Sequence, residues 1–372
     1  MTYFRLLWVV FVHPGYVERS AQYFAKKAEE RGNRTRKGSL TEKRSAQNGV
    51  LAGPGYTGTF TGANGVGSRT GSDQRPGLED FIRRDVFICQ GDGRPIFCSH
   101  CLNWKPDRTH HCREAVRCVR KMDHFCPWVG GVVSETSFKF FTQFVGWGAL
   151  YCVFNLIVIA VFLAEYKTNT GRLNVHWIVT VGLAALFGLF TVGMFGSSMQ
   201  FVLLNTTTIE NLSRKSVTYQ IAIHMPTPPQ QPPPFPTITY STAQVPPGEQ
   251  APPSALKTFA ILHSRPGDNP WDLGAFRNFK EVMGDKWYDW ILPVKHSPCT
   301  NHDRAESQFA VGSVIDRMRR DAGIATSNRE EKIHHRRRHR RRRSRKPPDH
   351  ADQAGKDEDR DGHGINESRD DR

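Results

Sequence analysis

The chain has 372 residues, of which 51 are Lys or Arg and 36 are Asp or Glu, so its formal net charge is +15. This length has room for two or three domains of about 100–200 residues each. Eight cysteines are too few for a disulfide-rich scaffold, and glycine shows no three-residue period, which excludes collagen. The mean hydropathy of −0.51 suits a polar soluble protein, but this average combines segments of very different character.

The N-terminal segment is apolar and carries one charge, Arg5, before the sequence His13-Pro14-Gly15. About ten apolar residues are too few to cross a bilayer, which needs about 20. The segment fits the core of a signal peptide, although no small-residue cleavage site follows, or the end of a longer membrane helix that begins outside this chain. Residues 17–80 are rich in Gly, Ser, Thr, Arg and Asn, which predicts a flexible linker.

Two later segments are long enough to cross a membrane. Residues 140–163 and 175–204 contain no charged side chain, and they predict transmembrane helices over 138–163 and 175–204. Two buried helices of a soluble core are the alternative, but such helices average about 11–12 residues. The short link between them predicts a hairpin. Basic residues outside its two ends place the cysteine-rich segment and the C-terminal half in the cytosol.

The C-terminal half changes composition several times. Residues 226–253 contain 11 of the 23 prolines, which predicts a polyproline II-like linker, either a spacer or a Pro-x-x-Pro ligand. Residues 269–293 are aromatic and predicted to be ordered. Residues 300–372 are predicted to be disordered, and nine Lys or Arg lie within 336–346. That run can attract anionic lipids or nucleic acid. In a membrane protein the lipid reading, or a solvated tail, is favoured, with no nucleic-acid partner.

Five of the eight cysteines fall within residues 98–126. In a reducing compartment such clustering indicates metal binding or catalysis rather than disulfides. Cys98 and Cys101 form a CxxC pair that His111 and Cys118 can complete as a tetrahedral site, which suits zinc. Unrelated thiols on a loop are the alternative. A basic zinc protein that binds DNA is a further class compatible with these motifs.

Cys126 lies in the sequence Asp123-His124-Phe125-Cys126. A thiolate is the reactive form of cysteine; a neighbouring His can take its proton, and an Asp can fix the His tautomer. A second metal knuckle is the alternative reading of this short motif. Its position just before a predicted transmembrane helix favours a nucleophile that meets a lipid-borne acyl group.

These motifs resemble those of the DHHC-type protein S-acyltransferases (palmitoyltransferases), and the chain is similar to filamentous-fungal members. The stretches that carry the resemblance are Cys98-x2-Cys101, Lys105-Pro106-x-Arg108-x2-His111-Cys112, Cys118, Met122-Asp123-His124-x-Cys126-Pro127-Trp128-Val129, Thr207-Thr208-Ile209-Glu210, Asn269-Pro270-Trp271-x2-Gly274-x3-Asn278 and His13-Pro14-Gly15. Their order and spacing agree with the family over residues 3–20 and 95–293.

The resemblance implies an α-helical multi-pass membrane protein with a small zinc-binding cysteine-rich domain between membrane helices, here residues 95–137. Long disordered linkers and a disordered tail complete it. By the family template residues 1–16 are the remnant of the second of four membrane helices, so we expect the chain to be a fragment or a shortened gene model. Residues 205–225 correspond to the family's TTxE region, and 269–293 to its C-terminal motif.

The resemblance also implies a two-step transfer of palmitate from palmitoyl-CoA to a cysteine of a substrate protein. Cys126 is then the nucleophile that carries the acyl group, His124 the base, and Asp123 the residue that orients His124. Zinc is structural. Supporting roles fall to Thr207, Thr208, Glu210 and Asn278. The implied partners are acyl-CoA, cysteine-bearing proteins and membrane lipids. The alternative is a catalytically weak or dead membrane scaffold of the same family.

Two departures from the family pattern have consequences. The family's second zinc site corresponds to Cys112, Ala115, Phe125 and Val132, and three of these four side chains cannot bind zinc. We therefore expect one zinc per chain, with an apolar cluster in place of the second ion. Gly130 and Gly131 also replace an Asn pair.

The acyl chain is expected to lie against aromatic side chains at and after the nucleophile. The candidates are Trp128, Phe141, Phe144 and Tyr151, the last three read as sharing one helix face. The alternative is that these aromatic rings face lipid or a neighbouring helix.

Overall fold

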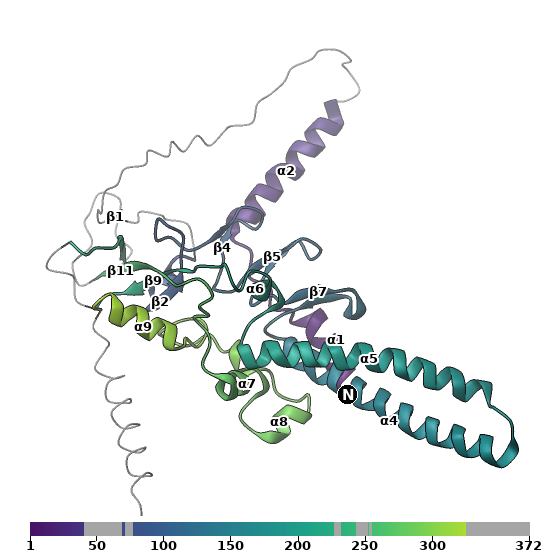
Figure 1. Ribbon diagram of the computed structural model, residues 1–372. Coiled ribbons are helices and arrows are strands. Elements are labelled where there is room, and N and C mark those ends of the chain that lie inside the picture. Colours follow the sequence, from purple (N-terminus) through teal and green to yellow (C-terminus); the bar gives the residue numbers. More distant parts are fainter. Residues whose placement is uncertain (41–68, 71–76, 227–231, 243–251, 253–254, 325–372) are drawn as a thin grey trace, which may run out of the picture. The chain divides into compact units, whose positions relative to one another are not determined.

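A computed structural model describes residues 1–40, 69–70, 77–226, 232–242, 252 and 255–324 (Figure 1). The basic run at 336–346 and the rest of the tail after residue 324 lie outside the described residues, and so do parts of the two predicted linkers.

Two long helices form an antiparallel hairpin: α4 (Phe138–Thr170) and α5 (Val175–Leu204). Gly171, at φ 68°, ends α4 in the left-handed conformation that glycine adopts easily. Asn174 begins α5 by accepting hydrogen bonds from the backbone of His176 and Trp177. Both helices are long and apolar enough to cross a membrane, and only 6% and 11% of their most apolar stretches are buried. Apolar surface of this extent suits a lipid environment.

The first helix, α1 (Thr2–Val12), packs against α4 through Leu6, Val9 and Val10. Its approach requires glycine at position 131, because a Cβ there would lie 2.3 Å from a methyl carbon of Val10. The chain then turns at Gly15, at φ 71°, and the backbone N–H of Val17 donates to the carbonyl of Cys118 at 2.9 Å. The N-terminal segment is thus joined to the cysteine-rich domain.

The prediction of a flexible linker over residues 17–80 is wrong at both ends. Helix α2 (Ala21–Leu40) follows directly, because eight of residues 21–30 are Ala, Gln, Lys or Glu, which favour a helix. Near residue 80, α3 (Glu79–Ile82) buries Phe81 and Ile82. Residues 41–68 and 71–76 lie outside the described part.

The cysteine-rich domain consists of three short antiparallel hairpins. They are β3 (Phe97–Cys98) with β4 (Asn103–Trp104), β5 (His110–Cys112) with β6 (Arg117–Val119), and β7 (His124–Cys126) with β8 (Gly131–Val133). A single 3₁₀ turn, η1 (Pro127–Val129), connects the last pair. Each hairpin has too few residues to bury a core of its own.

A five-stranded sheet lies beside this domain, in the order β1 (Arg69–Thr70), β10 (Thr237–Ser241), β11 (Leu256–His263), β9 (Gln220–His224) and β2 (Val86–Ile88). All pairs are antiparallel except β1 with β10. Helix α9 (Ser313–Asp321) covers one face through Val314, Ile315 and Met318. Aromatic side chains, among them Phe87 and Phe259, fill the other face.

The sheet corrects two predictions made from composition. Strand β10 lies inside the predicted proline-rich linker 226–253, because its five residues contain no proline and Ile238 and Tyr240 alternate into the core. Helix α9 lies inside the predicted disordered tail 300–372. Its three apolar residues fall on one side of an otherwise charged segment, so they form a helix face that average composition does not reveal.

Three helices and one turn complete the described chain. They are α6 (Thr208–Leu212), α7 (Ala275–Met283), α8 (Trp287–Ile291) and the 3₁₀ turn η3 (Pro298–Thr300).

Candidate functional site

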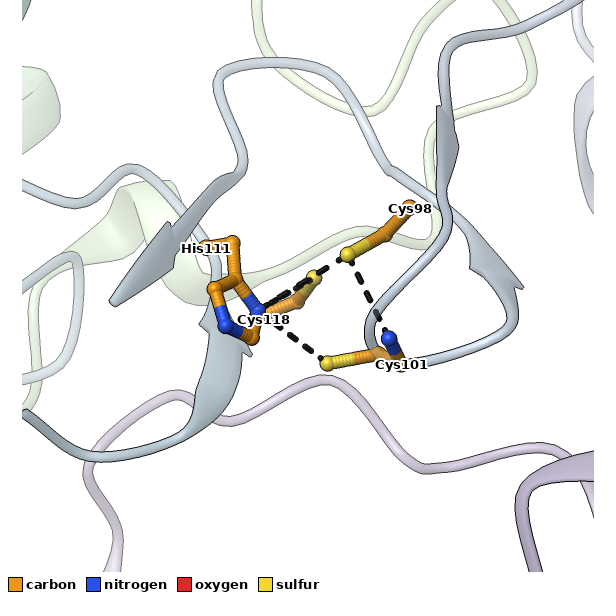
Figure 2. Close-up of side chains that lie close together, drawn as sticks. All are labelled: Cys98, Cys101, His111 and Cys118. Carbon is orange, nitrogen blue, oxygen red and sulfur yellow. Dashed lines mark hydrogen bonds between the residues drawn. The ribbon is translucent and has the colours of Figure 1, made fainter. Parts of the chain in front are cut away.

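The four predicted metal ligands meet at one point. The Sγ atoms of Cys98, Cys101 and Cys118 lie 3.7, 3.3 and 4.0 Å from Nδ1 of His111 (Figure 2). All four ligand atoms fall within 4.8 Å of one another. A tetrahedral ion with about 2.3 Å Zn–S and 2.0–2.1 Å Zn–N bonds needs ligand separations of about 3.5–3.8 Å. The cluster can therefore hold a metal ion.

The cluster is already arranged for bound thiolates. The backbone N–H of Cys101 donates to Sγ of Cys98 at 3.4 Å. Burial and the neighbouring sulfur atoms raise the pKa of the Cys118 thiol. A bound dication would reverse this effect, because it stabilises the thiolate more than the thiol.

The four positions that correspond to the family's second zinc site belong to one apolar cluster, as expected from their side chains. Cys112, Ala115, Phe125 and Val132 pack there with Val119 and Met122. Strand pairing places Phe125 directly opposite Val132. Among the described residues, no second group of three or more Cys, His, Asp or Glu side chains is placed to bind a metal. Apolar packing occupies the space between the hairpins at this place.

The candidate nucleophile lies at the end of strand β7. Because side chains alternate along a strand, His124 and Cys126 point to one face and Phe125 to the other. Nδ1 of His124 lies 2.7 Å from Oδ2 of Asp123. The carboxylate accepts, so Nδ1 carries the hydrogen and Nε2 keeps a lone pair that can take a proton. The ring of Phe141 packs edge-on against the imidazole, with centroids 5.4 Å apart.

Asp123 is held from the other side by helix α6. Thr208 donates to its carboxylate from the backbone N–H at 2.8 Å and from the hydroxyl at 2.9 Å. The preceding residue, Thr207, caps α6: its hydroxyl oxygen accepts from the backbone N–H of Glu210, and its own backbone N–H donates to the Glu210 carboxylate. This reciprocal cap fixes the first turn of α6, so it fixes the position of Thr208.

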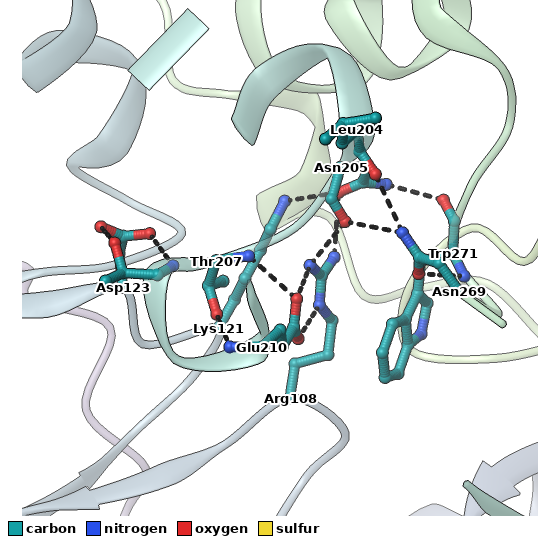
Figure 3. A network of polar contacts seen from close by, with 10 residues as sticks. Arg108, Lys121, Asp123, Leu204, Asn205, Thr207, Glu210, Asn269 and Trp271 are labelled. Atoms are coloured by element: carbon teal, nitrogen blue, oxygen red, sulfur yellow. Dashed lines mark hydrogen bonds and ion pairs between the residues drawn. The ribbon is translucent and has the colours of Figure 1, made fainter. Parts of the chain in front are cut away.

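Arg108 is the centre of a buried polar network (Figure 3). Its guanidinium donates to both carboxylate oxygens of Glu210 at 2.7 and 2.6 Å. It also donates to the side-chain and backbone oxygens of Asn205 at 3.0 and 2.9 Å, and it stacks 4.7 Å from the ring of Trp271. Burial acts to raise the pKa of Glu210, but the Arg108 charge and its hydrogen bonds outweigh this and lower it.

Two members of this network were not singled out from the sequence. Asn205 adopts a left-handed conformation at φ 46° and ends α5, and an Asn just after an apolar helix is a recognisable signal for this position. Lys121 donates to Oδ1 of Asn205 at 3.1 Å, and burial lowers its pKa. No local pattern distinguishes Lys121 from a surface lysine.

The C-terminal motif binds the same end of α5. Asn278 is fully buried and donates to the carbonyl of Leu203 at 2.8 Å. Asn269 donates to the carbonyl of Leu204 at 2.9 Å, and Asn205 donates to that of Trp271 at 2.9 Å. Asn278 therefore positions the chain after α5 and does not touch Cys126.

An apolar cavity of about 740 Å³ lies between α1, α4 and α5, and Cys126 is part of its wall. Three of the four predicted acyl-site residues line it: Trp128, Phe141 and Phe144. Trp128 is 81% exposed. Side chains that were not predicted come from Tyr3 on α1 and from Leu186, Phe187 and Met194 on α5.

The fourth predicted residue, Tyr151, does not line the cavity and is 70% exposed. Tyr151 lies within about 20° of Phe144 around the helix, so it shares the predicted face, but it is seven residues, or about 10 Å, further along α4 and beyond Gly148, the last α4 residue that lines the cavity. Gly148, seven residues after Phe141, is only about 20° away, and it does line the cavity. Tyr151 lies on the exposed surface of α4.

Comparisons with known proteins agree with this site. The family model described as DHHC palmitoyltransferase matches residues 92–215. The chain is 44% identical over 353 residues to palmitoyltransferase pfa5 of Aspergillus fumigatus, covering 89% of this chain and 78% of that protein. It is 46% identical over 288 residues to pfa5 of Emericella nidulans (68% and 58%) and 28% identical over 233 residues to human palmitoyltransferase ZDHHC15 (62% and 56%). The chain therefore belongs to the DHHC palmitoyltransferase family, as a protein S-acyltransferase of the filamentous-fungal type.

Proposed function

We propose that this chain transfers palmitate from palmitoyl-CoA to a cysteine of a substrate protein through a thioester on Cys126. The proposal rests on one observation: the nucleophile, its base and an apolar cavity lie together at one site. Cys126 lies in the wall of an apolar cavity, His124 lies two residues before it on the same face of β7, and Asp123 holds the imidazole at 2.7 Å.

In the first step Nε2 of His124 takes the proton of the Cys126 thiol. The resulting thiolate attacks the thioester carbonyl of palmitoyl-CoA, the bond from the carbonyl carbon to the CoA sulfur breaks, and CoA leaves with the proton from His124. In the second step His124 deprotonates the substrate cysteine. That thiolate takes the acyl group, and the released Cys126 thiolate recovers the proton.

The cavity supplies the binding energy for the acyl chain. At about 0.8 kcal/mol for each buried CH₂, a 16-carbon chain gives a gross driving force of about 12 kcal/mol. Phe141 lines the cavity and also packs on His124. Because one ring contacts both, a chain seated in the cavity lies beside the group that takes the proton.

The metal bound by Cys98, Cys101, His111 and Cys118 is proposed to be zinc with a structural role. Four protein ligands fill a tetrahedral ion and leave no open position, which is typical of structural zinc. When bound, the ion cross-links β3, β5 and β6. The positions Cys112, Ala115, Phe125 and Val132 are proposed to hold no second ion.

The helices α4 and α5 are proposed to cross the membrane, with Cys126 at the cytosolic surface of a multi-pass protein. Arg113, Arg117 and Arg120 precede α4 and Arg214 follows α5, as the positive-inside rule requires for cytosolic ends. All eight cysteines are free thiols, which suits a reducing compartment. Acyl-CoA, cysteine-bearing proteins and membrane lipids are the proposed partners.

The proposal is tested on membrane-reconstituted protein incubated with an alkyne analogue of palmitoyl-CoA. We expect a hydroxylamine-sensitive label that Cys126→Ser abolishes and Cys152→Ser, a change of a partly buried thiol on α4, leaves intact. A label that survives Cys126→Ser would overturn the role of Cys126. No label on the unmodified chain, with the protein folded and metal-loaded, would favour the membrane scaffold.

A further inference from the structure

The segment around α8 presents apolar and basic side chains together. Trp287 and Val294 are 67% and 66% exposed, and Ile291 and Leu292 are also exposed. Lys286 and Lys295 flank them, each with its ammonium over the ring of Tyr288, at 5.6 and 5.8 Å. These side chains are called the α8 patch: Lys286, Trp287, Ile291, Leu292, Val294 and Lys295.

The α8 patch is joined to the first turns of α4. The side-chain amide of Gln143 donates to the carbonyls of Asp289, Trp290 and Leu292 at 3.0, 3.0 and 3.3 Å. The indole of Trp147 donates to the carbonyl of Ile291 at 3.4 Å. These bonds fix the level of the α8 patch along α4, and α7, just before it, packs on α4 and α5 (Figure 1).

The position of the α8 patch along α4 matches the edge of the hydrocarbon core of a bilayer. A core of about 30 Å takes about 20 helical residues at 1.5 Å each. Counted back from Leu163, the last residue of the uncharged run, this stretch begins near Phe144. Gln143 and Trp147 therefore flank the boundary, and their hydrogen bonds to the backbone of residues 289–292 hold the exposed Ile291 and Leu292 at this level.

The charges of the α8 patch fit a phosphate-bearing surface. Two nearby carboxylates pair with other cations, Asp285 with Lys280 at 3.7 Å and Glu281 with Arg304 at 2.7 Å, and the third, Asp289, is buried. No ion pair of Lys286 or Lys295 occurs among the described residues. Tryptophan and tyrosine prefer the level of the lipid headgroups, and basic side chains there attract anionic lipids.

We infer that the α8 patch is a membrane-interface anchor that inserts Trp287, Ile291, Leu292 and Val294 among the lipids of the cytosolic leaflet and binds anionic headgroups through Lys286 and Lys295. The inference rests on the proposed membrane placement of α4 and α5. It makes the C-terminal part of the chain a lipid-contacting element in its own right.

The test uses the whole chain in nanodiscs, with p-benzoylphenylalanine replacing Trp287. Irradiation should attach a phospholipid to position 287, detected as added mass on that peptide. The same replacement at Leu256, an exposed apolar residue of β11, should attach none. Replacement at Phe154, exposed on α4, should attach lipid. Failure at 154 would refute the membrane placement, whereas lipid at 154 without lipid at 287 would refute the anchor alone.

The headgroup part of the inference has its own readout. In discs that mix phosphatidylserine with phosphatidylcholine, Lys286→Gln and Lys295→Gln should each lower the phosphatidylserine share of the adduct about fivefold, since a basic residue near the surface contributes about 1 kcal/mol. An unchanged share would refute headgroup binding. A crosslink from position 287 to a second copy of the chain would also overturn the inference.

Discussion

Thr208 holds the carboxylate of Asp123 with two hydrogen bonds, and the same carboxylate binds Nδ1 of His124. Thr208→Val removes the hydroxyl and keeps the backbone bond. A hydrogen bond to a charged group contributes about 1.5–3 kcal/mol, so we expect acyl-enzyme formation to slow about tenfold or more, measured by single-turnover labelling of Cys126. Thr206→Val is the matched control, because the buried Thr206 hydroxyl has no partner among the described residues. Equal slowing in both variants would contradict the role of Thr208.

The Arg108–Glu210 pair is fully buried on the arginine side. Arg108→Ala leaves an unpaired carboxylate, so we expect a loss of about 3–5 kcal/mol in the free energy of unfolding, measured by denaturation in detergent. The double variant Arg108→Met with Glu210→Gln removes both charges and should recover part of this loss. Arg304→Ala breaks the more exposed pair with Glu281 and should cost about 1 kcal/mol or less. Similar decreases in the free energy of unfolding for Arg108→Ala and Arg304→Ala would contradict the larger effect expected for the buried pair.

Asp107 makes the free energy of unfolding depend on pH. Burial raises its pKa to about 6, whereas an unfolded chain releases this proton near pH 4. Between pH 4 and pH 6 the folded state holds this proton and the unfolded state does not. The stabilisation that the proton gives the folded state is therefore complete below pH 4 and is lost as the pH rises through 6. The free energy of unfolding should fall across this window, by up to about 3 kcal/mol, relative to Asp107→Asn, which has no such proton. Parallel stability curves for the two proteins would refute the assignment.

The metal count separates the two candidate sites. We expect one zinc per chain by elemental analysis of the purified protein, because the second set of positions is apolar. Cys118→Ser should lose the metal and destabilise the fold, since zinc binding energy is also folding energy. Cys112→Ser, a change of a buried thiol that lies outside the four-ligand cluster, should retain one zinc. Two zinc ions per chain would overturn the single-site assignment.

Acyl-chain length should depend on Gly148 rather than on Tyr151. A Cβ at Gly148 would meet only a methyl of Thr191, at an ordinary 3.6 Å, so Gly148→Leu can extend into the cavity without moving the backbone. Each methylene that no longer fits should cost about 0.8 kcal/mol, or about fourfold in relative use of the longer acyl-CoA. Tyr151→Ala should leave chain preference unchanged in the same competition assay. A shift caused by Tyr151→Ala alone would contradict the cavity boundary.

Local spacing predicted the metal cluster well, because a CxxC pair, a later His and a later Cys can surround one tetrahedral ion in few arrangements. The sequence also placed Cys126 and His124 two residues apart on what proves to be one strand face. Tyr151 was misassigned because helical spacing gives a shared face but not how far along α4 the cavity extends, and the last α4 residue that lines it is Gly148.

The five-stranded sheet could not be predicted for a different reason. Its strands pair across long stretches of sequence, as Val86 does with Ile223, and β10 and α9 are short elements inside segments whose composition resembles linkers. The environment of Lys121 was likewise hidden, because its partner Asn205 approaches only when α5 ends beside the cysteine-rich domain.

The pairing of β2 with β9 also bears on how the protein is made. Strand β2 is synthesised before α4, and β9 only after α5. Strand β2 therefore has no partner β9 until both helices of the hairpin have been synthesised. If α4 and α5 cross the membrane as proposed, the two strands can pair only when both ends of the hairpin lie on one side of the bilayer. A chain that inserted only one of the two helices would leave β2 and β9 on opposite sides of the bilayer. With the membrane placement proposed above, such a chain would therefore leave the facing edges of β2 and β9 unpaired, and an exposed strand edge favours aggregation.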